Sequence, residues 1–339
     1  MSGGRESGGR GSGGSGGRGS GVRAGDLDRP AGLGPDREVR IAELAVLGVM
    51  ALWGANFIVV KAANEQIPPV AFAMLRFGSA ALILLAILRW REGGIGLPRR
   101  DLLPLLALGG LGFGIYQILW ATALQDIAAG DSALLIAATP VLVALFAVVA
   151  GSDTLTRLKL AGAIISFIGV ALVIAGGTGL TLGSTLIGDL VTLLAAACWA
   201  GYTAFAAPFL RRVSPLRTTA WAMIGGTLVL VPIGLTQLVA TDLATVETGS
   251  WLGLAYSALL PAGLANVIVF QAVRLVGPTR ITAFQSLVPA FAVIIAAVFL
   301  AEPIHAGQVV GGAVIVVGVW LTRRPNLVVP RFRPRPRAA

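Results

Sequence analysis

The chain has 339 residues, of which 56% are hydrophobic and only 12% are charged, and its mean hydropathy is +0.84. A soluble domain carries about 25% charged residues, so this composition excludes an ordinary soluble globular protein. The net charge of +10 first suggests a nucleic-acid partner, but the placement of the basic residues argues against one, and the single cysteine, Cys198, excludes an intrachain disulfide.

The two ends of the chain differ from its middle. Residues 1–40 are rich in Gly, Ser and Arg, a composition that cannot bury a core, so we expect a disordered cytoplasmic tail there. No short apolar stretch with a small-residue cleavage site follows, so this tail is not a signal peptide. Residues 323–339 form a second tail, which is basic and cytoplasmic.

Between the tails the sequence predicts ten transmembrane helices, because apolar runs of about 20 residues recur. In chain order they are 41–62, 69–90, 103–125, 128–150, 159–176, 186–208, 216–238, 251–273, 278–300 and 306–322. The first would be about 33 Å long, which is enough to cross a bilayer. The predicted fold class is an all-α polytopic membrane protein.

The basic residues predict how these helices are oriented. Of the 26 Lys and Arg, 24 lie on one side of the predicted membrane, in the tails and in the regions that follow the even-numbered helices. Lys61, at the end of the first helix, and Arg76, inside the second, are the two exceptions. The positive-inside rule therefore places both termini in the cytoplasm. We expect a multi-pass protein of the plasma (inner) membrane. The basic surplus is a topology signal and a contact for lipid headgroups.

An internal repeat divides the chain into residues 41–176 and 186–322, each with five helices. "ELAVLGVMALWGANF" from Glu43 matches "DLVTLLAAACWAGYT" from Asp189 at an offset of 146. Farther along, four pairs match at an offset of 149: Pro140 and Pro289, Asp153 and Glu302, Gly162 and Gly311, Gly169 and Gly318. Because five is odd, the second repeat must enter from the opposite side, which gives the inverted repeats typical of secondary transporters.

Several motifs together resemble the drug/metabolite transporter superfamily, specifically an EamA-type permease with two EamA domains. They are Trp53 to Phe57 (Trp-Gly-x-Asn-Phe), Leu75 to Phe77, Gly188 with Asp189, Trp199 to Tyr202, and Pro289 with Glu302 and Gly311. The resemblance covers about residues 41–323 and implies ten helices, cytoplasmic termini and transport of amino acids, metabolites or drugs. Asp153 departs from it, since the family usually has Glu there.

Arg76 is the only formal charge well inside a predicted helix. Placing an arginine in the membrane is unfavourable by about 2.5–3.5 kcal/mol on insertion scales, so the first hypothesis for such a residue is a functional role. It could bind an anionic group of the substrate or form a gate contact. The alternatives are that it snorkels to the interface or pairs with helix-end carbonyls.

The other candidate residues for a substrate cavity are polar and aromatic groups within the predicted helices. With Arg76 they are Trp53, Asn56, Tyr116, Gln117, Trp120, Trp199, Tyr202, Asn266 and Gln271. Gln117 matches Asn266 at the offset of 149, and Asn56 matches Tyr202 at 146. Polar groups without water need partners or line a wet cavity, so interhelical hydrogen bonds are the alternative interpretation. Tryptophan inside a helix walls a pocket or packs a core.

Glycines and prolines recur at matching positions. Gly54 and six others allow helices to approach closely, which is the packing role we expect: Gly110, Gly114, Gly162, Gly169, Gly311 and Gly318. Pro140 and Pro289 predict helix kinks, which suit either rocking helices or static bends.

These features predict a secondary transporter, a permease or exporter that moves a small metabolite, amino acid or drug-like solute by alternating access. It would need no cofactor and no metal, and its partners would be the solute and the lipid bilayer. Proton coupling, for which Glu43 and Asp189 are the best candidates, and a homodimer stay open. The alternatives are a membrane-embedded lipid-modifying enzyme, which would need a cluster of His, Asp or Cys, and a non-transporting sensor or scaffold. We therefore expect no enzyme.

Overall fold

The computed structural model describes residues 35–149, 155–176, 184–206, 208–276 and 284–323, and every regular element within these ranges is helical. Residues Val39–Ala339 form one compact unit, and Met1–Glu38 form another, of which only Pro35–Glu38 are described. The two predicted tails lie almost wholly outside the described residues, as does Asp153.

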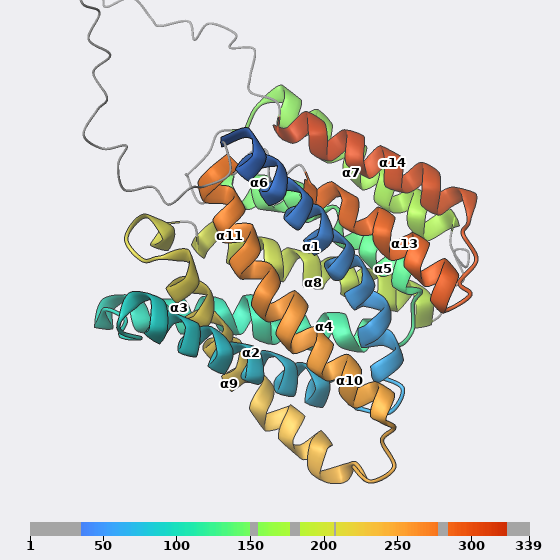
Figure 1. Cartoon of the computed structure of the whole chain (residues 1–339). Coiled ribbons are helices and arrows are strands. Elements are labelled where there is room, and N and C mark those ends of the chain that lie inside the picture. Colours follow the sequence, from blue (N-terminus) through green and yellow to red (C-terminus); the bar gives the residue numbers. More distant parts are fainter. Residues whose placement is uncertain (1–34, 150–154, 177–183, 207, 277–283, 324–339) are drawn as a thin grey trace, which may run out of the picture. The chain divides into compact units, whose positions relative to one another are not determined.

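The helices of the first half follow the predicted intervals closely (Figure 1). They are α1 (Pro35–Ala63), α2 (Pro69–Glu92), α3 (Arg99–Gly109), η1 (Gly110–Ile115), α4 (Tyr116–Ala123), α5 (Ala129–Ile136), α6 (Thr139–Val149) and α7 (Arg157–Gly176). The third predicted helix is the continuous run α3–η1–α4, and the fourth is the pair α5 and α6.

The second half repeats this order. It contains α8 (Ser184–Ala206), η2 (Phe209–Arg211), α9 (Pro215–Ala240), α10 (Thr248–Ser257), η3 (Ala258–Leu264), α11 (Ala265–Val276), η4 (Gln285–Leu287), α13 (Val288–Phe299) and α14 (Ala306–Arg323). The eighth predicted helix is the run α10–η3–α11, and the predicted ninth begins in residues outside the described ranges.

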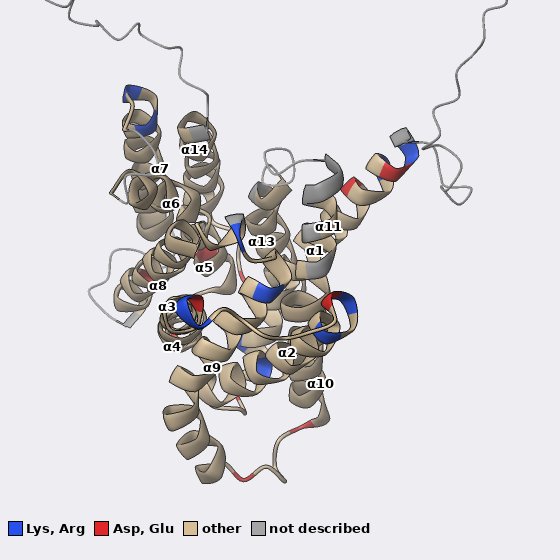
Figure 2. Ribbon diagram, turned by 90° about the vertical axis from the view of Figure 1, so that its left-hand side faces the viewer, with Lys and Arg blue, Asp and Glu red and all other residues tan. Residues whose placement is uncertain are grey.

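Seven helical segments among the described residues are long and apolar enough to cross a membrane. They are Arg37–Ala63, Pro69–Glu92, Arg99–Ala123, Ala129–Val149, Arg157–Gly176, Thr185–Ala206 and Pro215–Ala240, and Val288–Phe299 and Ala306–Thr322 are shorter apolar helices. Most charged residues lie at helix ends and in connections, and the helix bodies carry few (Figure 2). The described residues therefore define a helical, multi-pass membrane protein.

Local sequence explains where the helices begin and end. Pro69 begins α2, where a missing backbone N–H is tolerated, and Gly93 ends it with a left-handed φ of 71°. At the start of α9 the Ser214 hydroxyl accepts a hydrogen bond from the Arg217 N–H, and Pro215 follows the cap.

Two π-helical segments, η1 and η3, interrupt the third and eighth predicted helices. Shifted by the repeat offset of 149, Gly110–Ile115 falls on residues 259–264, which lie within η3. In η3, Pro261 lacks an N–H and disfavours a regular α-helical turn. In η1, three of the six residues are glycine. π-Helical turns are often found at functional sites, so these two segments mark matching places in the two repeats.

α7 and α14 lie side by side along their lengths (Figure 1). A Cβ added at Gly162 would lie 2.6 Å from the Gly318 carbonyl oxygen, and one added at Gly169 would lie 2.7 Å from that of Gly311. The Ser166 hydroxyl donates a hydrogen bond of 3.2 Å to the Ile315 carbonyl between these contacts. The expected packing role of these four glycines is confirmed. The two pairs exchange when each residue is replaced by its repeat equivalent.

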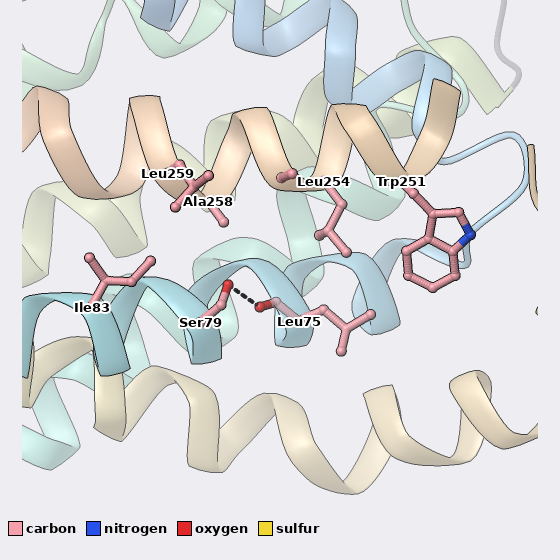
Figure 3. Close-up of a pocket in the computed structure, with 8 residues that line it drawn as sticks. Leu75, Ser79, Ile83, Trp251, Leu254, Ala258 and Leu259 are labelled. Carbon is pink, nitrogen blue, oxygen red and sulfur yellow. Dashed lines mark hydrogen bonds between the residues drawn. The ribbon is translucent and has the colours of Figure 1, made fainter. Parts of the chain in front are cut away.

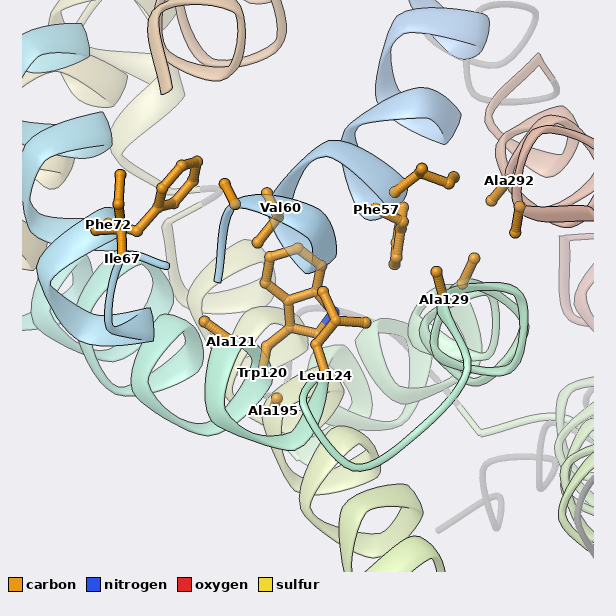
Figure 4. Packing of buried hydrophobic residues seen from close by; sticks show 14 of the residues in the cluster. Phe57, Val60, Ile67, Phe72, Trp120, Ala121, Leu124, Ala129, Ala195 and Ala292 are labelled. Carbon is orange, nitrogen blue, oxygen red and sulfur yellow. The ribbon is translucent and has the colours of Figure 1, made fainter. Parts of the chain in front are cut away.

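A buried apolar cluster joins α1, α2, α4, α5 and α13 (Figure 4). Phe57 meets Trp120 edge to face, with ring centroids 5.3 Å apart. Leu124 and Phe72 are almost completely buried in the same cluster. This core holds the ends of α1 and α4 together, and so fixes the helices that carry most of the candidate site.

Candidate functional site

The patch around Trp53 on α1 is bound to the η3 region of the other repeat. The Trp53 indole N–H donates to the Pro261 carbonyl at 3.1 Å, and Asn56 Oδ1 accepts a hydrogen bond of 2.6 Å from the Ser257 hydroxyl. On another side, a Cβ at Gly54 would lie 2.6 Å from Phe291 Cβ, so this glycine allows α13 to approach. Asn56 therefore makes an interhelical hydrogen bond, and Trp53 links the two repeats.

An aromatic cluster forms where α8 meets η1 and α4. Tyr116 lies 5.5 Å from Trp199 and 6.2 Å from Trp120 between ring centroids, and Trp199 lies 5.2 Å from Tyr202. Phe113 contacts both Trp199 and Tyr202. The structure thus brings together four of the predicted residues, Tyr116, Trp120, Trp199 and Tyr202.

Gly112 in η1 makes room for this cluster. A Cβ on Gly112 would overlap the Tyr202 ring, so a larger residue would displace that ring. Shifted by 149, Gly112 corresponds to Pro261, whose carbonyl binds Trp53. The two repeats therefore use equivalent places, one in each π-helical segment, to hold an aromatic side chain from the first helix of the other repeat.

Trp120 is buried too completely to form the wall of an open pocket. It is buried in the core cluster, and its indole N–H donates a 3.0 Å hydrogen bond to the Ser132 hydroxyl on α5. In this structure Trp120 packs a core, and its stacked neighbour Tyr116 is the more exposed of the two.

Arg76 is buried on α2, with only 7% of its surface exposed. It makes no ion pair or hydrogen bond through its side chain with any of the described residues, and its Nε is buried without a partner. Its guanidinium lies 4.6 Å from the Phe77 ring centroid and close enough to the Tyr116 and Tyr256 phenols for electrostatic interaction. Pairing with helix-end carbonyls, one of the alternatives, is not observed among the described residues.

The three remaining amides differ in their surroundings. Gln117 is buried, and its side chain makes no hydrogen bond within the described part of the chain. Asn266 donates to the Ala262 carbonyl one turn earlier in its own helical run, at 2.7 Å. Gln271 is half-buried on α11, and no hydrogen bond joins it to the other candidates among the described residues. The repeat equivalence of Gln117 and Asn266 thus does not extend to their hydrogen bonds.

Both predicted kink prolines lie at the start of an α-helical segment. Pro140 is the second residue of α6, just after the break that separates it from α5. Pro289 is the second residue of α13, which follows the short 3₁₀ turn η4. Each proline therefore lies where a regular α-helix is interrupted.

A polar cluster that was not predicted from the sequence joins the two repeats at one end of the bundle. Lys61 Nζ lies 2.9 Å from Glu302 Oε1 and donates to the Ile127 carbonyl at 2.8 Å. The two carboxylate oxygens of Glu302 also accept the N–H groups of Ala129 (3.0 Å) and Gly130 (3.3 Å) at the start of α5. The sequence signals were Lys61, a lone basic residue on the side poor in Lys and Arg, and Glu302, which belongs to the motif with Pro289 and Gly311, but neither indicated the other as its partner.

Two buried carboxyl groups lie near this cluster. Asp131 Oδ1 accepts a 2.7 Å hydrogen bond from the Gln308 amide and lies within electrostatic range of Glu302, His305 and Lys61. Asp189, on α8, interacts electrostatically with Asp131 and has no hydrogen-bond partner among the described residues. Both residues are only 6% exposed. If both carboxyl groups were ionised, two negative charges would lie close together with little water to stabilise them.

An apolar groove of about 380 Å³ runs between α2 and the α10–η3 segment (Figure 3). Leu75 and Ser79 line it on α2, and Leu254 and Ala258 face them. The Ser79 hydroxyl donates a 2.7 Å hydrogen bond to the Leu75 carbonyl. The groove is therefore an apolar surface. Its lining includes Leu75, the residue before Arg76, but not Arg76 itself.

Comparison with known proteins agrees with this architecture. A sequence model of the EamA-like transporter family matches residues 40–175 and 186–324. The chain belongs to the EamA-like transporter family, and it is a transporter rather than an enzyme. The two matched regions coincide with the two repeats predicted from the sequence.

The chain matches curated relatives that are named as transporters, and the matches cover nearly the whole length of these relatives. The chain is 28% identical to the Bacillus subtilis protein "Uncharacterized transporter YyaM", covering 87% of this chain and 97% of the relative. It is 30% identical to the "Probable terminal-alkyne amino-acid exporter" of Streptantibioticus cattleyicolor, covering 84% and 93%. It is 27% identical to the "Probable amino-acid metabolite efflux pump" of Salmonella typhimurium, covering 82% and 93%.

One solved crystal structure of a protein is similar in fold. It is 18% identical to this chain, with a TM-score of 0.59 over 84% of this chain and 97% of the other. At this identity the likeness concerns the fold alone.

Proposed function

We propose that the protein moves a small amino-acid-like metabolite across the plasma membrane by alternating access between two inverted repeats. The observation that carries the mechanism is the reciprocal packing of α7 against α14. Ser166 bonds to its own repeat equivalent, Ile315, and the two glycine pairs beside it exchange under the offset of 149. A pseudo-twofold axis between two halves is the arrangement expected of inverted repeats.

The proposed topology has ten transmembrane helices, in repeats 41–176 and 186–322, between the cytoplasmic tails 1–40 and 323–339. Support comes from the basic residues, which gather on one predicted side, and from the match of helices to the predicted intervals. The reversed order of the glycine contacts, Gly162 with Gly318 and Gly169 with Gly311, makes α7 and α14 antiparallel, as inversion requires.

The proposed substrate site lies where α1, α2, α4, α8 and the α10–η3 segment meet. The aromatic groups of Tyr116, Trp199 and Tyr202 supply apolar walls, and the nearby buried polar groups supply recognition. Two relatives are named as exporters or efflux pumps for amino acids or their metabolites, which supports a solute of that size and polarity.

The proposed outer gate is the cluster around Lys61 and Glu302. It joins α1 and α5 of the first repeat to the α13–α14 connection of the second, on the side opposite the basic loops. Opening a path to that side by rocking the repeats apart would break these contacts. Alternating access would therefore open and close this cluster once in each cycle.

Proton coupling is proposed at the carboxyl pair of Asp131 and Asp189 rather than at Glu43. The pair would reduce its repulsion by binding one proton, and the neighbouring titratable groups are Glu302, His305 and Lys61. The homodimer stays a prediction.

The experiment is uptake by purified protein in proteoliposomes, using a panel of radiolabelled neutral amino acids, with and without an imposed pH gradient. We expect saturable uptake that protein-free liposomes lack, and stimulation by the gradient that is lost in Asp189→Asn and retained in Asp242→Asn, an exposed loop control. Absence of saturable uptake of every solute would contradict the transport proposal. Equal stimulation of both variants would contradict the coupling site alone.

A further inference from the structure

Arg76 is a buried cation without a counter-charge. Within the described residues it has no carboxylate, carbonyl or hydroxyl partner for its guanidinium, and its Nε is fully buried. Other arginines of the described chain are paired, such as Arg212 with Asp101 at 2.7 Å and Arg217 with Glu92 at 3.0 Å. A buried charge is normally paired, so the structure around Arg76 lacks an anion.

The neighbours of Arg76 can complete an anion site but cannot neutralise the arginine. The phenols of Tyr116 and Tyr256 lie within electrostatic range, and a phenol O–H donates hydrogen bonds. The Tyr256 hydroxyl uses its one proton in a 2.9 Å hydrogen bond to the Leu52 carbonyl, so the donors left for an anion are the Arg76 guanidinium and the Tyr116 hydroxyl. The site therefore offers donors and one positive charge, which suits a group that only accepts hydrogen bonds.

The location suits a substrate rather than a structural ion. Tyr116 directly follows the π-helical segment η1, and Tyr256 lies two residues before η3. Arg76 thus lies between the matching segments of the two repeats, beside the aromatic cluster of Tyr116, Trp199 and Tyr202. A ligand bound there would contact both halves that alternating access moves.

We infer that Arg76 binds the anionic group of the transported solute, and that this group is a carboxylate. This inference rests on the proposed transport function and specifies its substrate class. One guanidinium balances the single negative charge of a carboxylate group, whereas a phosphate dianion would leave an uncompensated charge in an apolar setting. The planar guanidinium also matches the two oxygens of a carboxylate.

The test compares solutes and variants in the full-length protein. The probes are L-leucine, L-phenylalanine and L-methionine, each paired with its own amide, which has the same shape but no carboxylate. The variants are Arg76→Met and Arg76→Lys, and Arg89→Met is the control because Arg89 is an exposed arginine on the same helix. Ligand binding is measured as a shift in melting temperature Tm in detergent, and transport as uptake into proteoliposomes.

We expect the acids, and not the amides, to raise the Tm of the wild type and of Arg89→Met. Arg76→Met should lose uptake at least tenfold and lose the Tm shift, and Arg76→Lys should recover part of both. Without ligand, Arg76→Met should melt at or above the wild-type temperature, because an unpaired buried charge has been removed. A purely structural arginine would instead give a lower Tm and no solute discrimination.

The outcomes separate the two proposals. Equal uptake of acids and amides, or unchanged acid uptake by Arg76→Met, overturns the carboxylate site and leaves the transport function standing. If the acids raise Tm in the wild type but not in Arg76→Met, and no acid is taken up, the result contradicts the transport proposal and supports the carboxylate site. Absence of a Tm shift with every acid overturns the site.

Discussion

The Ser166 hydroxyl donates a hydrogen bond to the Ile315 carbonyl, and these two residues occupy the same position in the two halves of the chain, 149 residues apart. A residue can contact its own repeat equivalent only near an axis that relates the repeats. The glycine pairs on either side of this bond are reciprocal in the same way. The α7–α14 contact is therefore the natural fixed point about which two repeats could rock.

A first prediction concerns this contact. Gly169→Ala should lower the stability of the protein in detergent by about 1–3 kcal/mol, because the added methyl would overlap the Ile315 and Gly311 backbone. Gly48→Ala is the matched control, since nothing lies within 4 Å of that position on α1. There the helix propensity of alanine should leave stability unchanged or raise it by up to about 1 kcal/mol. Equal effects of the two substitutions would argue against tight α7–α14 packing.

A second prediction concerns the bond between Asn56 and Ser257. Asn56→Ala should destabilise the protein by about 1–3 kcal/mol, because it leaves the fully buried Ser257 hydroxyl without an acceptor. Adding Ser257→Ala should then have a smaller effect than in the wild type, with a coupling energy of about 1 kcal/mol. Thr203→Ala, which removes an exposed hydroxyl, should change stability by less than about 0.5 kcal/mol. Additive effects of the first two substitutions would contradict the bond.

The helices and the site differ in how far the sequence predicts them. The helix intervals, the repeat and the close approach at Gly162, Gly169 and Gly54 could be predicted, because hydropathy and small residues at matching positions report them directly. The π-helical segments could not, since a run such as "GLGFGI" has the same apolar pattern in either kind of helix.

Specific side-chain contacts between different elements could not be predicted from the sequence either. Lys61 and Glu302 are 241 residues apart, and neither has a local pattern that selects the other. Trp120 appeared equivalent to the other mid-helix tryptophans, but its bond to Ser132 depends on how α5 packs against α4. The unpaired state of Arg76 likewise depends on what surrounds it in three dimensions.

A third prediction concerns the proposed outer gate. A double-mutant cycle of Lys61→Met and Glu302→Gln should give a coupling energy of about 1 kcal/mol, because both side chains are largely buried and also bind backbone groups. The Arg100–Asp101 pair, at 3.8 Å with an exposed arginine, should give a coupling near zero.

The same variants should change access to the gate. In a Cys198→Ser background, Lys61→Met should increase the rate at which an impermeant maleimide labels Ala128→Cys, a half-buried position beside the cluster. Labelling of the exposed control Glu65→Cys should not change. An unchanged rate at Ala128→Cys would show that the pair does not control access from that side.

The most direct test of the central claim is the sidedness of equivalent loops in the two repeats. Single cysteines in the Cys198→Ser background would be placed at Glu65 and Leu210, which follow the first helix of each repeat, and at Gly96 and Asp242, which follow the second. All four positions are exposed. An impermeant maleimide added outside intact cells should label Glu65→Cys and Asp242→Cys, and should reach Leu210→Cys and Gly96→Cys only after the membrane is permeabilised. Labelling of both members of an equivalent pair from the same side would contradict inverted repeats and the alternating-access account built on them.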